Sequence, residues 1–497
     1  MDEEASLMGL FSEKDVLQPL FRASESYGLK DCLEILIAAS RTGDGRSDLA
    51  SKNNILPAVL DLSRLLPYPS ASQYLSLALK LLRNLCAGEI VVQDSFIVLN
   101  GVGVVSTILR SVRVGITGPD HGVIRVGLQV LANISLAGEE HQRAIWRQAF
   151  PNEFAELAMV RSRETCDPLC MIIYTCVDGS PGLIAELCGD QGLPVVAEIV
   201  RTVSVVGFGE DWLKLLLSRI CLEESHFFPL FSILFFHHDC QHIEGANLSG
   251  STCFSSEQAY ILSILSIILS ERIGEITISN GFALCVFGIF KKSAGAIRYD
   301  LRGKTGLPTG SAIIDALGYS LTILKDICAL DGRIGIEDDL EDTVDTLVSS
   351  GLLELLLGLL RELEPPTIIR KALKKNDNQE ATVSCSPKLC PYKGFRRDIV
   401  AVIGNCAYRR KHVQDEIRKM NWIFLLLQQC VTDEDNPFLR EWGIWAVRNI
   451  LEGNTENQQI VAELEIQGSV DMPEIADLGL RVQVDHNNRR AKLVNVP

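Results

Sequence analysis

Apolar residues recur along most of the chain at the three- and four-residue spacing of α-helices, and strand-like alternation is rare. The stretch "TLVSSGLLELLLGLLREL" (346–363) shows this spacing clearly, as does "NPFLREWGIWAVRNILEG" (436–453). Helices that are apolar on several sides are typical of stacked assemblies, because each one contacts several neighbours. The pattern predicts an all-α protein.

Four of the predicted helices end in the same way. Each apolar run reaches an asparagine, and a glutamine follows nine residues later; the pairs are Asn84 with Gln93, Asn133 with Gln142, Asn405 with Gln414, and Asn449 with Gln458. The neighbouring asparagines are 49 (84 to 133) and 44 (405 to 449) residues apart. Armadillo and HEAT repeats have similar periods, about 40–47 residues. We therefore predict an armadillo/HEAT-like superhelical solenoid, in which repeats stack and share one core.

Polar, Gly/Ser/Pro-rich stretches divide this array into parts. We expect an N-terminal helical cap with a flexible loop (1–54), a repeat body with loop insertions (55–363), a disordered insertion (364–396), a C-terminal domain of two repeats (397–468) and a tail (469–497) whose end looks unstructured. Within the body, 242–258 and 291–311 are interpreted as surface loops.

Charge and composition exclude several classes of function. The net charge of −16 argues against nucleic-acid binding, which needs dense Lys and Arg. The apolar runs at 227–236 and 259–269 are shorter than the roughly 18 residues of a membrane-spanning helix, so we expect no membrane insertion. The 15 cysteines are an odd number, and the acidic N-terminal sequence does not resemble a signal peptide. We expect reduced thiols and a cytoplasmic location.

Two segments hint at other chemistry. "RGKTG" (302–306) is half of a phosphate-binding loop, but the first glycine of that motif is replaced by Arg298 and no strand precedes it. "HHDCQH" (237–242), with Cys221 and His226, offers metal-ligand types without a metal-ligand frame. A regulator that responds to metal or nucleotide through 221–242 or 291–311 is therefore an alternative. No catalytic motif is evident, and we expect neither an enzyme nor a bound cofactor.

The asparagines allow two interpretations. Each carboxamide either satisfies backbone groups where repeats meet, or lines a groove and binds a partner peptide. "WAVRN" (445–449) favours the second, because it resembles the Trp-x-x-x-Asn element of armadillo importins. The other three asparagines have Lys80, Gln129 and Ala401 at the tryptophan position, and a basic N-terminal arm is missing. A nuclear-transport adaptor therefore remains only a further alternative.

The C-terminal sequence resembles a known family. Asn405-Cys406, Gln414-Asp415, "LLLQQCVTDEDNPFLREW" (425–442) and "RNILEGNTENQ" (448–458) closely resemble the C-terminal domain of the ataxin-10 family, and of its plant members more than its animal ones. This resemblance implies an armadillo-like, non-enzymatic cytoplasmic scaffold that binds protein partners in cytokinesis or cell-growth signalling. It implies no cofactor and no catalytic residue.

The sequence nominates one surface for partner binding. Trp445 and Asn449 lie one helical turn apart, so an indole and a carboxamide are expected on one face. Arg448 would add charge selection beside them. The candidate partner-binding residues are Trp442, Trp445, Arg448, Asn449 and Asn405. The partner itself and the oligomeric state are not predicted.

Overall fold

The computed structural model describes residues 27–52, 54–114, 118–207, 211–235, 254–272, 274–330, 342–370, 387–464, 480–485 and 490–495. The chain divides into two compact units. The first comprises residues 1–297 and 308–326, and the second comprises 298–307 and 327–497. The predicted repeat body, 55–363, is therefore shared between the two units.

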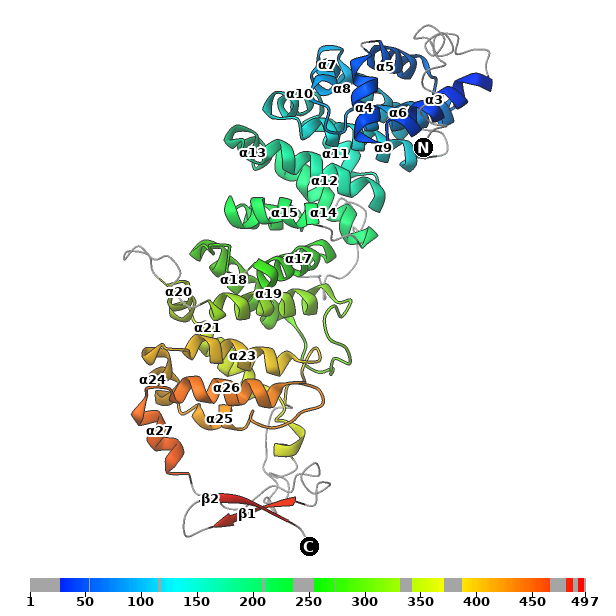
Figure 1. Cartoon of the computed structure of the whole chain (residues 1–497). Coiled ribbons are helices and arrows are strands. Elements are labelled where there is room, and N and C mark those ends of the chain that lie inside the picture. The colour runs from blue at the N-terminus through cyan, green and yellow to red at the C-terminus, as the bar shows by residue number, and fades with distance from the viewer. Residues whose placement is uncertain are drawn as a thin grey trace, which may run out of the picture. The chain divides into compact units, whose positions relative to one another are not determined.

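The helices of the first unit follow the apolar periodicity of the sequence (Figure 1). They are α3 (Tyr27–Ala39), α4 (Gly43–Ser51), α5 (Ile55–Leu65), α6 (Ser72–Leu85), α7 (Ile90–Val98), α8 (Gly101–Arg113), α9 (His121–Ser135), α10 (Glu139–Ala149), α11 (Asn152–Ala158), α12 (Arg163–Val177), α13 (Pro181–Leu187), α14 (Gly192–Val206), α15 (Asp211–Ser218) with the π-helix η1 (Arg219–Glu223), α16 (Phe227–Ile233), α17 (Ser256–Arg272), α18 (Asn280–Ala296) and most of α19 (Ala312–Ala329).

The second unit holds the remaining elements. They are α20 (Thr343–Ser349), α21 (Leu352–Glu362), α23 (Phe395–Ala407), α24 (Lys411–Lys419), α25 (Ile423–Leu427), α26 (Leu439–Leu451), α27 (Thr455–Ala462), β1 (Leu480–Asp485) and β2 (Arg490–Asn495).

Helix α9 shows why these segments fold as they do. The Asp120 side chain accepts a hydrogen bond from the Val123 N–H and caps the first turn. Beyond the cap, most side chains are buried and apolar, because α9 packs against α6, α8, α10 and α12. Gly127 allows a close approach to α8, since an added Cβ would lie 2.9 Å from the Leu109 side chain. A helix enclosed in this way is apolar nearly all round.

Repeat stacking appears as rows of helices. In the first unit α3, α6, α9, α12 and α15 pack in succession, while α5 with α8 and α11 with α14 belong to an adjoining layer. In the second unit α23 packs against α21 and α26. The predicted fold class, an all-α solenoid of helical repeats, is confirmed. We call the helices that end at the repeated asparagines, α6, α9, α23 and α26, the ladder helices.

The C-terminal tail differs from the prediction. β1 and β2 pair as an antiparallel hairpin, with Leu480 opposite Asn495 and Asp485 opposite Arg490. The sequence of β1, "LRVQVD", alternates apolar and polar residues, which favours a strand over a coil. The expectation that the end of the tail is unstructured is therefore wrong for Asp485 and for β2.

The predicted disordered insertion, 364–396, is in part well packed. Tyr392 and Arg396 are buried, and α23 already begins at Phe395. Backbone hydrogen bonds hold the end of the insertion: the Gly303 N–H donates to the Cys390 carbonyl (2.9 Å) and the Lys393 N–H to the Thr305 carbonyl (2.8 Å). Pairing with a distant loop is invisible to composition. Residues 371–386 lie outside the described residues.

Two predicted loops contain ordered structure as well. In the N-terminal region, 43–51 form α4, which Thr42 caps and Leu49 anchors in the core. Of the loop predicted at 291–311, the first six residues continue α18 and the next part packs against 390–393. An alanine at Gly303 would place its Cβ 2.1 Å from the Pro391 carbonyl oxygen. Of the loop at 242–258, residues 242–253 lie outside the described part of the chain.

Candidate partner-binding surface

The repeated asparagines serve the fold. The Asn449 side chain is buried and donates to the Gly404 carbonyl at 2.9 Å, and the Asn133 side chain donates to the Arg83 carbonyl at 2.7 Å. In both cases the acceptor residue directly precedes the asparagine of the previous ladder helix (Figure 1). Carbonyls in the last turn of a helix lack intrahelical partners, so the next repeat supplies one.

The glutamines complete this arrangement. In all four repeats the Gln amide donates to the carbonyl seven residues earlier, at the C-terminal end of the ladder helix; the pairs are Gln93 with Cys86 (2.9 Å), Gln142 with Ser135 (3.1 Å), Gln414 with Ala407 (3.3 Å) and Gln458 with Leu451 (2.7 Å). Gln93 and Gln414 also donate to the carbonyls of Asn133 and Asn449 in the next repeat. The nine-residue offset is therefore set by capping geometry.

This result corrects part of the predicted site. Asn449 and Asn405 are buried, so their carboxamides are not available to grip a partner. The prediction that the Asn449 carboxamide binds a partner beside Trp445 is therefore wrong, because Asn449 is buried and points into the α23–α26 contact. The same finding removes the exposed Trp–Asn pair on which the likeness to import adaptors was based.

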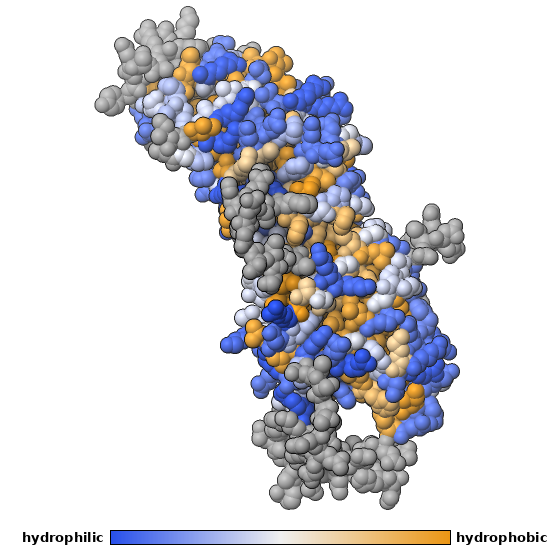
Figure 2. All heavy atoms as spheres, turned by 180° about the vertical axis from the view of Figure 1, so that it is seen from behind, coloured by the Kyte–Doolittle hydropathy of each residue, from blue (hydrophilic) through white to orange (hydrophobic). Residues whose placement is uncertain are grey.

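Trp445 and Arg448 do lie on the surface of α26. The Trp445 side chain is 49% exposed, and the Arg448 guanidinium stands over its ring at 4.7 Å from the centroid. Ile444, which the sequence analysis did not select, is 54% exposed beside them, and Trp442 is half-buried. Apolar side chains reach the surface in other places as well (Figure 2). We call Ile444, Trp445 and Arg448 the α26 surface.

The opposite face of α26 fixes this surface in place. Gly404 of α23 lies so close to α26 that an added Cβ would be 3.0 Å from the Ala446 Cβ. An added Cβ at Gly443 would lie 2.6 Å from the Gln429 carbonyl oxygen. Close backbone approaches of this kind leave little freedom for α26 to shift, so the indole and guanidinium are presented from a rigid element.

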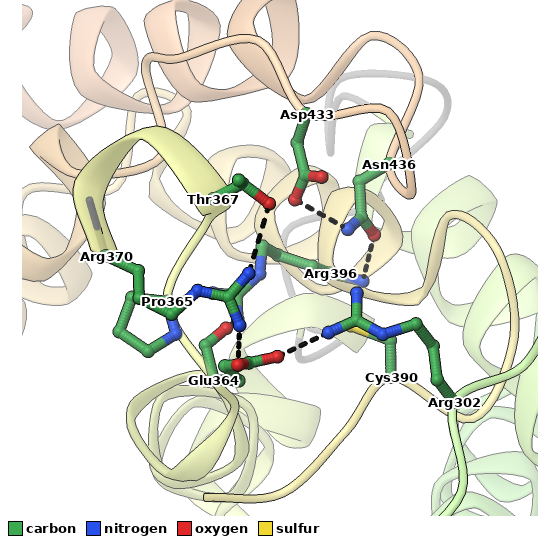
Figure 3. Close-up of a pocket in the computed structure, with 9 residues that line it drawn as sticks. All are labelled: Arg302, Glu364, Pro365, Thr367, Arg370, Cys390, Arg396, Asp433 and Asn436. Atoms are coloured by element: carbon green, nitrogen blue, oxygen red, sulfur yellow. Dashed lines mark hydrogen bonds and ion pairs between the residues drawn. The ribbon is translucent and has the colours of Figure 1, made fainter.

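The half phosphate-binding loop has a structural role. Arg302 and Arg370 both form ion pairs with the Glu364 carboxylate (Figure 3). Arg302 also forms an ion pair with Asp435. The buried Arg396 donates to the Glu364 carbonyl and to Gln429 Oε1, the latter at 3.1 Å. Burial lowers the pKa of Arg396. The hollow among these side chains encloses about 10 Å³, room for one water molecule at most and none for a nucleotide.

The candidate metal cluster is only partly described. Residues 237–242 lie outside the described residues. Cys221 is buried, and burial raises the pKa of its thiol well above the ordinary range, while His226 Nδ1 lies 2.6 Å from the Glu224 carbonyl oxygen. Among the residues that the structure describes, His, Cys, Asp and Glu side chains form no group of three suited to a metal ion.

The lengths and hydropathies of the helices bear on membrane insertion. Within the described ranges, no single helix is long and apolar enough to cross a membrane. Two sharply bent pairs, α7 with α8 and α20 with α21, meet the length and composition requirement only when each pair is taken together.

Known proteins place this architecture in a family. Residues 395–494 match the model of the spinocerebellar ataxia type 10 protein domain, which spans α23 to β2. An ataxin-10 homolog of Dictyostelium discoideum is 39% identical over 105 residues, covering 21% of this chain and 17% of that protein. The likeness to ataxin-10 of Xenopus tropicalis is 25% over 415 residues (81% and 77% of the two chains), and to that of Homo sapiens 25% over 446 residues (86% and 83%).

Solved structures add little to this assignment. An engineered protein of known crystal structure aligns over 91% of this chain and 100% of its own, with 14% identity and a TM-score of 0.35, from which we draw no conclusion. The sequence matches are more specific. The domain match lies in the second unit, and the relatives align along most of the chain. The domain match and the relatives together support the ataxin-10 family as the family of this chain.

Proposed function

We propose that this chain is a non-enzymatic scaffold that binds a protein partner through the α26 surface. The observation that carries the proposal is the exposed Trp445 ring with Arg448 stacked over it, on a helix fixed from behind by close backbone contacts. Tryptophan and arginine dominate the energetics of protein interfaces, and a preorganised pair loses little conformational entropy on binding.

The chemistry of the surface indicates what the partner presents. Ile444 and Trp445 offer an apolar shelf, which favours an aliphatic or aromatic side chain. Arg448 lies at its edge and is exposed, which favours a carboxylate in the partner. A partner segment with an apolar residue beside an acidic one would therefore fit.

Location and pathway belong to the same proposal. The 15 cysteines, which we interpret as reduced thiols, support a cytoplasmic location. The resemblance to the ataxin-10 family supports a scaffold that acts in cytokinesis or cell-growth signalling. A fluorescent fusion of the full chain tests the location. Accumulation in the nucleus would contradict it and would favour a nuclear role.

Affinity capture from cells with mass spectrometry tests the partner surface. Full-length protein is compared with Trp445→Ala and Arg448→Glu, and both variants should lose the same principal partner. Arg440→Glu is the matched control, because Arg440 also belongs to α26, its side chain is 43% exposed, and it forms an ion pair with the neighbouring Glu441. The proposal is wrong if both α26-surface variants retain the partner at wild-type levels.

A further inference from the structure

The repeat relates the α26 surface to a second place in the chain. Trp445 and Arg448 stand four residues and one residue before Asn449. The same two positions before Asn84 are held by Lys80 and Arg83 on α6. Since the ladder helices share one capping geometry, equivalent positions have the same place within their own repeats. Basic residues therefore occupy on α6 the place that the indole and guanidinium occupy on α26.

Arg83 is held in place by neutral groups. Its Nε and Nη2 donate to Asn84 Oδ1 at 3.2 and 3.0 Å, and its Nη1 donates to Gln129 Oε1 on α9 at 3.1 Å. These contacts orient the guanidinium across the contact between α6 and α9. The side chain is half-buried, so it is positioned rather than free to move in solvent.

In the described structure, no ion pair balances the positive charges of Lys80 and Arg83, whereas Arg125 has a carboxylate partner. Within the described part of the chain, no carboxylate forms an ion pair with Lys80 or Arg83, and Arg125 on α9 pairs only with Glu164, at 3.5 Å. Burial, and then the charge of Arg125, lower the pKa of Arg83. Such a patch is unusual in a chain whose net charge is −16. Uncompensated charge on a positioned side chain favours an anionic ligand.

We propose that Lys80, Arg83, Arg125 and Gln129, the α6–α9 surface, dock an extended acidic segment of a partner protein. Packed helices lie about 8–10 Å apart, and an extended chain rises about 3.3 Å per residue. Carboxylates two or three residues apart therefore reach cations on both helices. The Gln129 amide, whose oxygen orients Arg83, offers its N–H groups to the segment backbone.

The test uses the full chain and a fluorescein-labelled peptide of alternating glutamate and serine, with binding followed by fluorescence anisotropy. Lys80→Glu should weaken binding about tenfold and leave the melting temperature unchanged, since Lys80 makes no ion pair in the described structure and charge reversal repels the peptide. Lys291→Glu makes the same charge change at an exposed position of α18 and should bind the peptide like wild type. Raising the salt concentration should weaken wild-type binding, because exposed charges are screened.

Other outcomes would overturn the proposal. Equal binding by wild type and Lys80→Glu would mean that the peptide binds elsewhere. Tighter binding of an oligouridylate of the same charge would mean that the ligand is a nucleic acid and not a protein segment. Full competition by inorganic phosphate at low concentration would mean that the site binds phosphate. Trp445→Ala should leave peptide binding unchanged. The proposal for the α6–α9 surface is therefore tested independently of the proposal for the α26 surface.

Discussion

Replacing Asn449 with alanine separates a structural asparagine from a binding one. In the folded chain its side-chain N–H donates to the Gly404 carbonyl at 2.9 Å, and the residue is 2% exposed. Alanine cannot donate, and α26 lies too close to α23 for solvent to replace the carboxamide freely. The Gly404 carbonyl, in the last turn of α23, would lose its partner from the neighbouring repeat.

The expected loss follows from this geometry. A buried acceptor left without a partner costs about 1–3 kcal/mol, and the small void left by the shorter side chain adds to it. We take about 2 kcal/mol for Asn449→Ala. For a unit of 150–250 residues each kcal/mol lowers the melting temperature by about 2–4 °C, so the second unit should melt about 4–8 °C earlier.

Tryptophan fluorescence during thermal unfolding measures this shift, because Trp422, Trp442 and Trp445 all lie in the second unit. Arg448→Glu, one residue away on the exposed face, should melt within about 1 °C of wild type, since surface charges contribute little. An unchanged melting temperature for Asn449→Ala would refute the capping role. Loss of partner binding in a variant of unchanged stability would mean that the Asn449 carboxamide contacts the partner.

Three further predictions concern single residues. Gly303→Ala should lower the melting temperature of the second unit by several degrees, because its Cβ would lie 2.1 Å from the Pro391 carbonyl oxygen, whereas Gly306→Ala, with its nearest such neighbour at 3.9 Å, should melt like wild type. Burial raises the pKa of the Cys176 thiol to about 12, so iodoacetamide labelling followed by mass spectrometry should leave Cys176 unmodified in native protein after the partly exposed Cys32 has reacted; equal labelling of both would contradict its burial. Burial, then the charge of Glu354, raise the pKa of Glu416, so its contribution to stability is full below the unfolded pKa and is lost as pH rises through the folded pKa. Glu416→Gln should therefore raise the melting temperature at neutral pH and match wild type below about pH 4. A lower melting temperature for Glu416→Gln at neutral pH would contradict the sign.

The sequence alone was sufficient for the fold class, because helical periodicity and the Asn–Gln offset are local signals. Each glutamine donates to the carbonyl seven residues before it, so the hydrogen bond joins residues that are close in the sequence. The spacing that this bond requires is therefore visible in the sequence itself. The identity of the family also came from a contiguous stretch, 397–464, which the domain match contains. Trp445 and Arg448 could be nominated because one helix carries both.

Tertiary structure decided which of those residues are available. Asn449 is buried because α23 approaches α26 at Gly404, and no feature of 436–459 encodes how close that neighbour comes. The loop at 298–305 and the end of the insertion, 388–394, are ordered because they hydrogen-bond to each other across about ninety positions of sequence. The charge of Arg83 is significant only because α9 brings Arg125 and Gln129 beside it. Long-range contacts of this kind depend on how helices stack, and composition does not contain that information.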